Sequence, residues 1–239
     1  MAQRLGTRSD LQLTLSLAGR TMRPAPQPVP VRSGGFGGAD GLAAYLSAER
    51  IAVLVDATHP YAAQMSANAA RAAEKTGVGF LALRRPAWER AAGDRWNEVG
   101  DVNEAVDALG RAPQRVFVAL GRKDLAPLAR APQHHYLVRS VDPIDPPLPV
   151  PNACYVTGRG PFTENEDRAL LVAHRIDAVL AKNSGGQATY GKIAAARTLG
   201  IVVVMVRRPD LPEVASVATV EEAIAWFDHR RTPSADRGV

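Results

Sequence analysis

The stretch Gly77-Val-Gly-Phe-Leu-Ala-Leu-Arg-Arg-Pro86 decides how this sequence folds, because the chain repeats it. Gly200-Ile-Val-Val-Val-Met-Val-Arg-Arg-Pro209 has the same form 123 residues later: a glycine, an apolar strand and then Arg-Arg-Pro. Each copy follows an alanine-rich helix and precedes a short helix that opens at Asp101 or at Thr219. A repeat of this length predicts two similar α/β domains, with a cleft between them where a small molecule would bind.

Apolar strands and helical segments alternate outward from the repeat. The expected strands are 11–17, 29–32, 51–55, 78–83, 115–120, 154–157, 177–181 and 201–206, and the expected helices are 39–47, 61–76, 102–109, 190–198 and 219–229. A further helix is expected to begin at Thr163, whose hydroxyl can form a capping box with Glu166. This alternation is typical of βαβ units with a parallel sheet. We therefore predict the α/β class, with two Rossmann-like, doubly wound domains.

A proline-rich segment separates the two expected domains. Residues 142–151 hold five prolines in ten positions, which suits neither a strand ladder nor a helix interior. We predict a linker at 141–151 between a first domain, residues 1–140, and a second domain, residues 152–231. Residues 232–239 are polar and are expected to be disordered. Residues 1–6 look like the end of a first helix, so the first strand is expected to be missing, or to lie upstream of Met1.

Composition excludes several classes of protein. No apolar run approaches the ~18 residues that a membrane span needs, and Cys154 is the only cysteine, so no internal disulfide can form. These features predict a cytoplasmic protein. The formal net charge of +5 favours an anionic ligand over nucleic acid, because the basic residues are dispersed. His134 and His135 have no partner at ligand spacing, so no metal site is predicted.

The first domain carries polar residues after its expected strands. Ser16-Leu-Ala-Gly19-Arg20-Thr21 follows the first strand, and in nucleotide-binding domains an arginine with Ser or Thr there accommodates a 2′-phosphate. Gly34-Gly35-Phe36-Gly37-Gly38 fails the dinucleotide fingerprint, yet four glycines around a phenylalanine suggest backbone pressed against a flat ligand. The alternative for both segments is a surface turn.

The segment Asp56-Ala-Thr58-His59-Pro-Tyr61 sits where a strand ends and a helix begins. Ligands of open α/β sheets bind at this edge, and the segment offers a carboxylate, a hydroxyl, an imidazole and a phenol. The alternative is that Asp56 or Thr58 only caps the helix.

The matching edge of the second domain is rich in donors. Lys182-Asn183-Ser184-Gly185-Gly186, followed by Thr189 and Lys192, combines cations, amide and hydroxyl groups and free backbone N–H groups beside a helix N-terminus. This arrangement predicts anion binding. Lys123 and Arg159 follow other strands and add cations at the same edge.

Taken in this order, these motifs resemble the precorrin-6A reductases of cobalamin biosynthesis over about residues 7–229. The resemblance implies an NADPH-dependent oxidoreductase that reduces one double bond of the precorrin-6A macrocycle to give precorrin-6B. The substrate is a polycarboxylate tetrapyrrole, which would account for the basic balance. The family usually opens with a strand and a Gly-Gly-Thr-x-Glu-Ala turn that receives the cofactor pyrophosphate, and this sequence has no such segment.

The resemblance also distributes roles among the candidate residues. His59 and Tyr61 are expected to supply the proton. The expected NADPH-binding residues are Ser16, Gly19, Arg20, Thr21, Gly35, Phe36, Gly37, Asp56 and Thr58. The expected substrate-binding residues are Lys123, Arg159, Lys182, Asn183, Ser184, Gly185, Gly186, Thr189 and Lys192. Two alternatives stay open: reduction of the cobalt-containing macrocycle, and a non-catalytic NADP(H)-binding protein. The sequence does not predict the oligomeric state.

Overall fold

The structure, a computed structural model, describes residues 1–19 and 24–231. The chain divides into two compact units. Unit 1 holds Met1–Arg85 and the chain from Pro209 onward, and unit 2 holds Pro86–Arg208. Every ladder between strands is parallel in both units. The predicted α/β class with parallel sheets is therefore confirmed.

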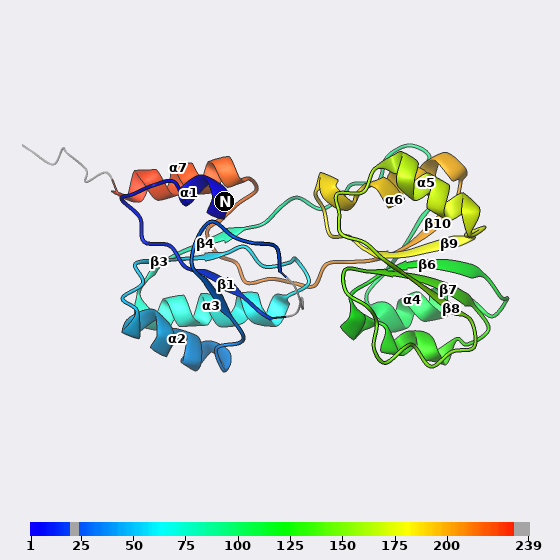
Figure 1. Cartoon of the computed structure of the whole chain (residues 1–239), viewed down its shortest axis with the longest axis horizontal. Coiled ribbons are helices and arrows are strands. Elements are labelled where there is room, and N and C mark those ends of the chain that lie inside the picture. The colour runs from blue at the N-terminus through cyan, green and yellow to red at the C-terminus, as the bar shows by residue number, and fades with distance from the viewer. Residues whose placement is uncertain (20–23, 232–239) are drawn as a thin grey trace, which may run out of the picture. The chain divides into compact units, whose positions relative to one another are not determined.

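Unit 1 contains two small sheets. One pairs β1 (Leu15–Leu17) with β2 (Val31–Ser33), and the other has the order β11 (Ser216–Val217), β4 (Gly79–Leu83), β3 (Val53–Asp56). Its helices are α1 (Ala2–Leu5), α2 (Gly38–Ala48), α3 (Ala63–Thr76) and α7 (Val220–Arg231). Figure 1 shows α2 and α3 on one face of the three-stranded sheet and α7 on the other. Helices on both faces leave the strand ends as the place where polar loops gather.

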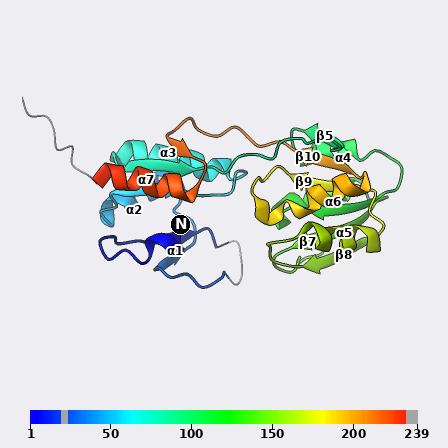
Figure 2. The same ribbon diagram turned by 90° about the horizontal axis from the view of Figure 1, so that it is seen from above.

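Unit 2 is built on one six-stranded sheet. Its order is β5 (Trp96–Val99), β10 (Val202–Val206), β9 (Ala178–Lys182), β6 (Arg115–Ala119), β7 (His135–Ser140), β8 (Ala153–Thr157). Its helices are α4 (Val102–Ala108), α5 (Glu164–Ala173) and α6 (Gly191–Leu199), with short 3₁₀ turns η1 (Arg122–Asp124), η2 (Ala126–Arg130) and η3 (Gln187–Thr189). Within this unit, Figure 2 shows β5 and β10 at one side and β7 and β8 at the other.

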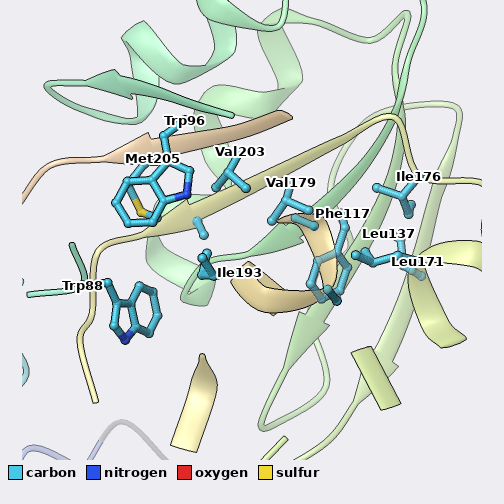
Figure 3. Close-up of a cluster of buried hydrophobic side chains, with 13 residues drawn as sticks. Trp88, Trp96, Phe117, Leu137, Leu171, Ile176, Val179, Ile193, Val203 and Met205 are labelled. Carbon is cyan, nitrogen blue, oxygen red and sulfur yellow. The ribbon is translucent and has the colours of Figure 1, made fainter. Parts of the chain in front are cut away.

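The core of unit 2 fills the space between its sheet and helices α5 and α6. Phe117, Val179 and Ile193 are wholly buried within it. Figure 3 shows Trp88 and Trp96 toward one end of this cluster and Leu171 and Ile176 toward the other. The predicted capping box opens α5: the Thr163 side chain accepts from the Glu166 N–H, and the Glu166 carboxylate accepts from the Thr163 N–H.

The repeated Arg-Arg-Pro motifs lie where the chain passes between the units. The chain leaves unit 1 after β4, at Arg85 and Pro86, and returns to it after β10, at Arg208 and Pro209. On arrival in unit 2 it forms β5 beside β10, and on return it forms β11 beside β4. The strand before each crossing therefore lies between its own βαβ partner and the strand that arrives from the other unit.

The predicted domain boundaries are wrong. The expected linker, 141–151, joins β7 to β8, which pair side by side in the sheet of unit 2. Leu148 within it is buried, and its N–H donates to the Tyr155 hydroxyl at 2.7 Å. Prolines stiffen a loop inside a domain as well as a linker between domains, so composition alone did not separate the two. The expected disordered tail, 232–239, lies outside the described residues.

Three strands have no counterpart among the expected ranges: β5, β7 and β11. Of these, β5 and β11 each follow a crossing. β5 and β11 are short, and the exposed residues Asn97, Glu98 and Ser216 interrupt their apolar pattern. Such segments become strands because a neighbouring strand edge offers them backbone partners. The Arg84 N–H donates to Val217 O and the Arg207 N–H donates to Val99 O, each at 2.8 Å.

Candidate functional site

A pocket of about 200 Å³ lies in unit 1, at the carboxyl ends of β3 and β4. Parallel α/β sheets bind ligands at this edge. Its walls combine polar groups with apolar side chains from three separate stretches of chain. They are Asp56, Ala57, Thr58, His59, Pro60, Ser66, Leu83, Arg84, Arg85, Leu211, Ala218 and Val220. The pocket therefore includes three of the four polar residues expected in the segment 56–61.

Asp56 is the buried carboxylate of this pocket, with 6% of its surface exposed. Its Oδ1 accepts the Thr58 N–H at 3.0 Å, which turns the chain away from β3. The Thr58 Oγ1 lies 3.2 Å from the Oγ of Ser66, a buried residue in the first turn of α3. Neither Asp56 nor Thr58 caps α3, whose N-cap is Ala62. The capping alternative for these residues is therefore wrong.

His59 and Tyr61 follow on the same loop. The His59 side chain is exposed and lines the pocket, and its Nδ1 accepts the Tyr61 N–H at 3.3 Å. This contact places the proton of a neutral His59 ring on Nε2. The two rings lie 5.6 Å apart, and Tyr61 is half-buried outside the pocket lining. The expected proton donors thus lie together, with His59 the nearer to the pocket.

Two pocket arginines were not predicted as site residues. Arg84 and Arg85 belong to the first Arg-Arg-Pro motif and extend from the end of β4. Arg84 Nη2 donates to Pro212 O at 2.6 Å, whereas its Nε is buried with no hydrogen-bond partner in the described parts of the chain. Their position directly after a repeated strand was the signal that could have identified them, because it places them at the ligand-binding edge.

The glycine-rich turn precedes α2 in the same unit. Gly37 is the N-cap of α2 with φ of 79°, a conformation that favours glycine. A Cβ added at Gly35 or Gly37 would meet no atom within 4 Å, so the backbone of the turn is approachable. One face of Phe36 is already covered, because the Arg32 guanidinium lies 3.8 Å from its ring centroid. Arg32 also donates to Gly34 O and Gly35 O at 2.7 Å.

The remaining expected cofactor residues lie beside this turn. Ser16 pairs with Arg32 across the β1–β2 ladder, so their side chains share a face of that sheet. Gly19 has φ of 68°, and a Cβ there would lie 3.3 Å from the Ser33 hydroxyl. Arg20 and Thr21 lie outside the described residues. Arg32 was missed by sequence reasoning, although it lies two residues before the glycine turn.

In unit 2 the loop after β9 is held by contacts within the protein. The Asn183 side chain accepts the Trp88 N–H at 2.7 Å and donates to Trp88 O at 2.9 Å. The Trp88 Nε1 donates to Gly186 O at 2.9 Å. A Cβ at Gly185, whose φ is 67°, would lie 2.0 Å from Pro86 O, so only glycine fits there. Asn183, Gly185 and Gly186 thus shape the loop, and much of their polar capacity is already used.

The expected cations of unit 2 differ in their surroundings. Lys182 forms an ion pair with Asp124, with 2.7 Å between Nζ and Oδ2. Lys123 in η1 and Arg159 after β8 are exposed at the same strand edge. Ser184 is half-buried, and its Oγ lies 3.4 Å from Lys182 O. Lys182, Lys123 and Arg159 therefore remain as candidate partners for an anion.

Lys192 lies in the interior of unit 2, where only 4% of its surface is exposed. Its Nζ donates to Thr189 O at 2.5 Å and lies 4.7 Å from the Trp88 ring centroid. Burial lowers the pKa of Lys192 to about 7, with a further lowering from Arg139 and an opposing effect from Asp167. Lys192 therefore lies inside unit 2, because the first turn of α6 faces inward, and its expected role in substrate binding stays a prediction.

In residues 1–19 and 24–231, no group of three His, Cys, Asp or Glu side chains is arranged to hold a metal ion. Among the helices of that same part of the chain, none has the length and apolar character needed to cross a bilayer.

Comparison with known proteins identifies close relatives along nearly the whole chain. A family model described as precorrin-6x reductase CbiJ/CobK matches residues 1–228. The chain is 52% identical over 234 residues to a precorrin-6A reductase of Sinorhizobium sp, covering 98% of this chain and 90% of that protein. It is 49% identical over 229 residues to a precorrin-6A reductase of Rhodobacter capsulatus, covering 95% and 90%. A solved structure of CobK precorrin-6A reductase matches with a TM-score of 0.90 and 47% identity, covering 99% of this chain and 94% of that one.

Proposed function

The chain belongs to the CbiJ/CobK family of precorrin-6x reductases, and on that premise we propose how it reduces precorrin-6A in cobalamin biosynthesis. Unit 1 binds NADPH through its strand-end loops, and unit 2 binds the macrocycle through cations at its own strand ends. The product is precorrin-6B, formed when one double bond takes up a hydride and a proton. The pocket at the ends of β3 and β4 carries this proposal, because it gathers the polar segment 56–61 in one place.

Two observations support a nicotinamide dinucleotide in unit 1. The backbone at Gly35 and Gly37 has open space where a side chain would otherwise lie, which suits a loop that approaches a ligand closely. The buried Arg84 Nε lacks a hydrogen-bond partner among the described residues, which indicates a place where a ligand acceptor belongs. NADPH supplies the hydride when bound.

The adenosine end of the cofactor is assigned to the β1–β2 side of unit 1. Ser16, Gly19 and the glycine turn with Phe36 would hold it, and Arg20 and Thr21 would contact the 2′-phosphate that distinguishes NADPH from NADH. Asp56 and Thr58 would hold the nicotinamide end. The two ends of the cofactor are assigned to these loops in the order in which their strands follow one another along the chain. Polar loops that follow successive parallel strands lie at one edge of a sheet.

The carboxylates of the macrocycle are assigned to unit 2. Lys123, Arg159 and Lys182 are the cations at its strand ends, and charge-assisted hydrogen bonds to carboxylates are among the strongest polar contacts. Asp124 holds Lys182 in place beforehand, which reduces the entropy lost when substrate binds. Thr189, Ser184 and the backbone of Gly185 and Gly186 line the same loop.

The proton is assigned to His59, with Tyr61 beside it. His59 can give up its Nε2 proton as the imidazolium ion, in which a proton on Nδ1 replaces the hydrogen bond that Nδ1 accepts from the Tyr61 N–H in the neutral ring. The exposed ring can recover a proton from water between turnovers.

The test separates the two assigned ligands. Lys182→Ala should raise the KM for precorrin-6A about tenfold while the Kd for NADPH changes less than about twofold, because a charge-assisted contact to substrate is lost. Lys75→Ala, which removes another surface lysine paired to an aspartate, is the matched control. Unchanged substrate kinetics in Lys182→Ala would contradict the assignment. NADPH and NADH titrations of the unaltered chain test the cofactor choice directly.

A further inference from the structure

The pocket of unit 1 has a mixed chemical lining that selects a particular functional group. Leu83, Leu211 and Val220 supply apolar wall, whereas Asp56 supplies a carboxylate and Arg84 and Arg85 supply guanidinium groups. The remaining polar lining residues are Thr58, His59 and Ser66. A volume of about 200 Å³ is smaller than the roughly 300–1,000 Å³ of pockets that hold drug-sized ligands. The pocket therefore suits one ring with its substituent, and neither a whole dinucleotide nor a macrocycle.

The donor is the Nε–H of Arg84. The guanidinium is fixed at one terminal nitrogen by Pro212 O, 2.6 Å away, while Nε is shut off from water and has no hydrogen-bond partner in the described ranges. An unpaired buried donor costs free energy that a ligand acceptor would recover. Only a group that enters the pocket can reach it, through a small turn of the flexible arginine side chain.

The acceptor is the carboxylate of Asp56. It is buried, and its Oδ1 accepts one backbone N–H, that of Thr58. A carboxylate has about four lone-pair positions, so it can accept further hydrogen bonds. A group that uses both residues therefore donates to Asp56 and accepts from Arg84.

A primary carboxamide on a flat ring meets both requirements. We propose that this pocket recognises the carboxamide of nicotinamide, with Arg84 donating to its carbonyl oxygen and Asp56 accepting from its NH₂ group. The inference rests on the proposed binding of NADPH to unit 1 and assigns two residues the task of orienting the ring. Asp56 is the last residue of β3 and Arg84 directly follows the neighbouring strand β4, so the sheet itself sets their spacing.

The first experiment uses the unaltered chain and four nucleotides. The Kd is measured by calorimetry for NADP⁺, for its 3-acetylpyridine analogue, for nicotinic acid adenine dinucleotide phosphate, and for 2′-phospho-ADP-ribose, which lacks the ring. Replacing NH₂ by methyl, or the carboxamide by a carboxylate, should each weaken binding about tenfold, because neither replacement can donate to the buried Asp56 carboxylate. The ring-free fragment provides the baseline.

Two variants then assign the residues. Arg84→Met should bring the Kd for NADP⁺ close to that of the ring-free fragment, whose own Kd should not change. Asp56→Asn should reduce the penalty on the carboxylate analogue at least about tenfold, because an amide can donate to it. Arg71→Met removes a charge from an exposed position on α3 and is the matched control. Circular dichroism establishes that each variant is folded.

The outcomes separate this inference from the proposed function. If the three ring-containing nucleotides bind equally while the ring-free fragment binds more weakly, or if Arg84→Met weakens the fragment as much as NADP⁺, the carboxamide assignment is wrong and cofactor binding stands. If none of the four nucleotides binds the unaltered chain, the assignment of NADPH to unit 1 falls, and this inference falls with it.

Discussion

The two copies of the repeat share one topology and differ in what fills the end of the sheet. In unit 1, β3, α3 and β4 come before a crossing, and β11 and α7 come after the return of the chain. In unit 2, the corresponding elements before a crossing are β9, α6 and β10. The corresponding elements on arrival in unit 2 are β5 and α4. The ladder registers align Asp56 of unit 1 with Ala181 of unit 2. One copy therefore places a carboxylate where the other places a methyl group.

The difference extends to the residues beyond each crossing. Two positions after the proline, unit 1 has Leu211, which lines the pocket, and unit 2 has Trp88. Trp88 is buried and bonds to Asn183 and Gly186 of the loop after β9. The path of the backbone is common to both copies, and the side chain two residues after the proline differs. Leu211 lines a pocket at the strand ends of unit 1, whereas Trp88 fills the equivalent space in unit 2.

The largest expected effect is the loss of stability on replacing Trp88, which fills the strand end of unit 2. Trp88→Leu gives unit 2 the side chain that unit 1 has at the equivalent position, and it should lower the free energy of unfolding by about 3 kcal/mol. The loss combines a cavity with an unpaired Gly186 carbonyl. Urea unfolding followed by far-UV circular dichroism measures it.

The control for Trp88 is the same change in unit 1. Trp226→Leu alters a half-buried tryptophan of α7 and should cost clearly less. An equal loss of unfolding free energy in both variants would mean that Trp88 is an ordinary core residue. It would contradict the interpretation that Trp88 fills in unit 2 the space that is a pocket in unit 1.

The converse change should close the pocket. Leu211→Trp introduces into unit 1 the side chain that fills unit 2, and the affinity for NADP⁺ should fall about 100-fold, because an indole occupies most of the space that the ring would use. Fluorescence or calorimetric titration measures it. Binding of 2′-phospho-ADP-ribose should be retained, and full retention of NADP⁺ affinity would show that the ring lies elsewhere.

Part of this contrast between the two copies could be predicted from the sequence, and part of it depends on contacts between residues far apart in the chain. The repeat, the strand ends and the loop 56–61 were predictable, because apolar runs and the residues that follow them are local features. The crossings were not, since nothing in Arg-Arg-Pro says which sheet the next strand will join. The role of Trp88 could not be predicted either, because its partners Asn183 and Gly186 are 95 and 98 residues away.

Lysine residues show the same limit. Lys192 follows a glycine-rich loop and has the sequence context of a surface cation. When α3 and α6 are aligned on the glycines that end them, Gly77 and Gly200, Lys192 corresponds to the buried Ala69 of α3. The helical face on which a residue lies depends on where the helix begins. α6 begins at Gly191, so Lys192 points to the core.

The smallest expected effect is a pH dependence of stability that Lys192 causes in unit 2 and that its counterpart in unit 1, Ala69, cannot cause. Burial lowers the folded-state pKa of Lys192 to about 7, against an ordinary value near 10.5. Below pH 7 the lysine is charged in both states and the cost of burying that charge is fully present. As pH rises above 7 the folded form loses the proton while the unfolded chain keeps it, so stability should rise by up to about 1.4 kcal/mol per pH unit.

Lys192→Met isolates this contribution, because methionine keeps much of the side chain without the charge. The unfolding free energy of the unaltered chain should gain about 2 kcal/mol relative to Lys192→Met between pH 7.5 and 9. Arg139 and Asp167 face the same ammonium group and oppose each other, so Asp167→Asn should move the rise to lower pH. A difference that stays constant with pH would mean that Lys192 is charged inside unit 2, held by Asp167 and the Thr189 carbonyl, and that the two helices differ in charge as well as in shape.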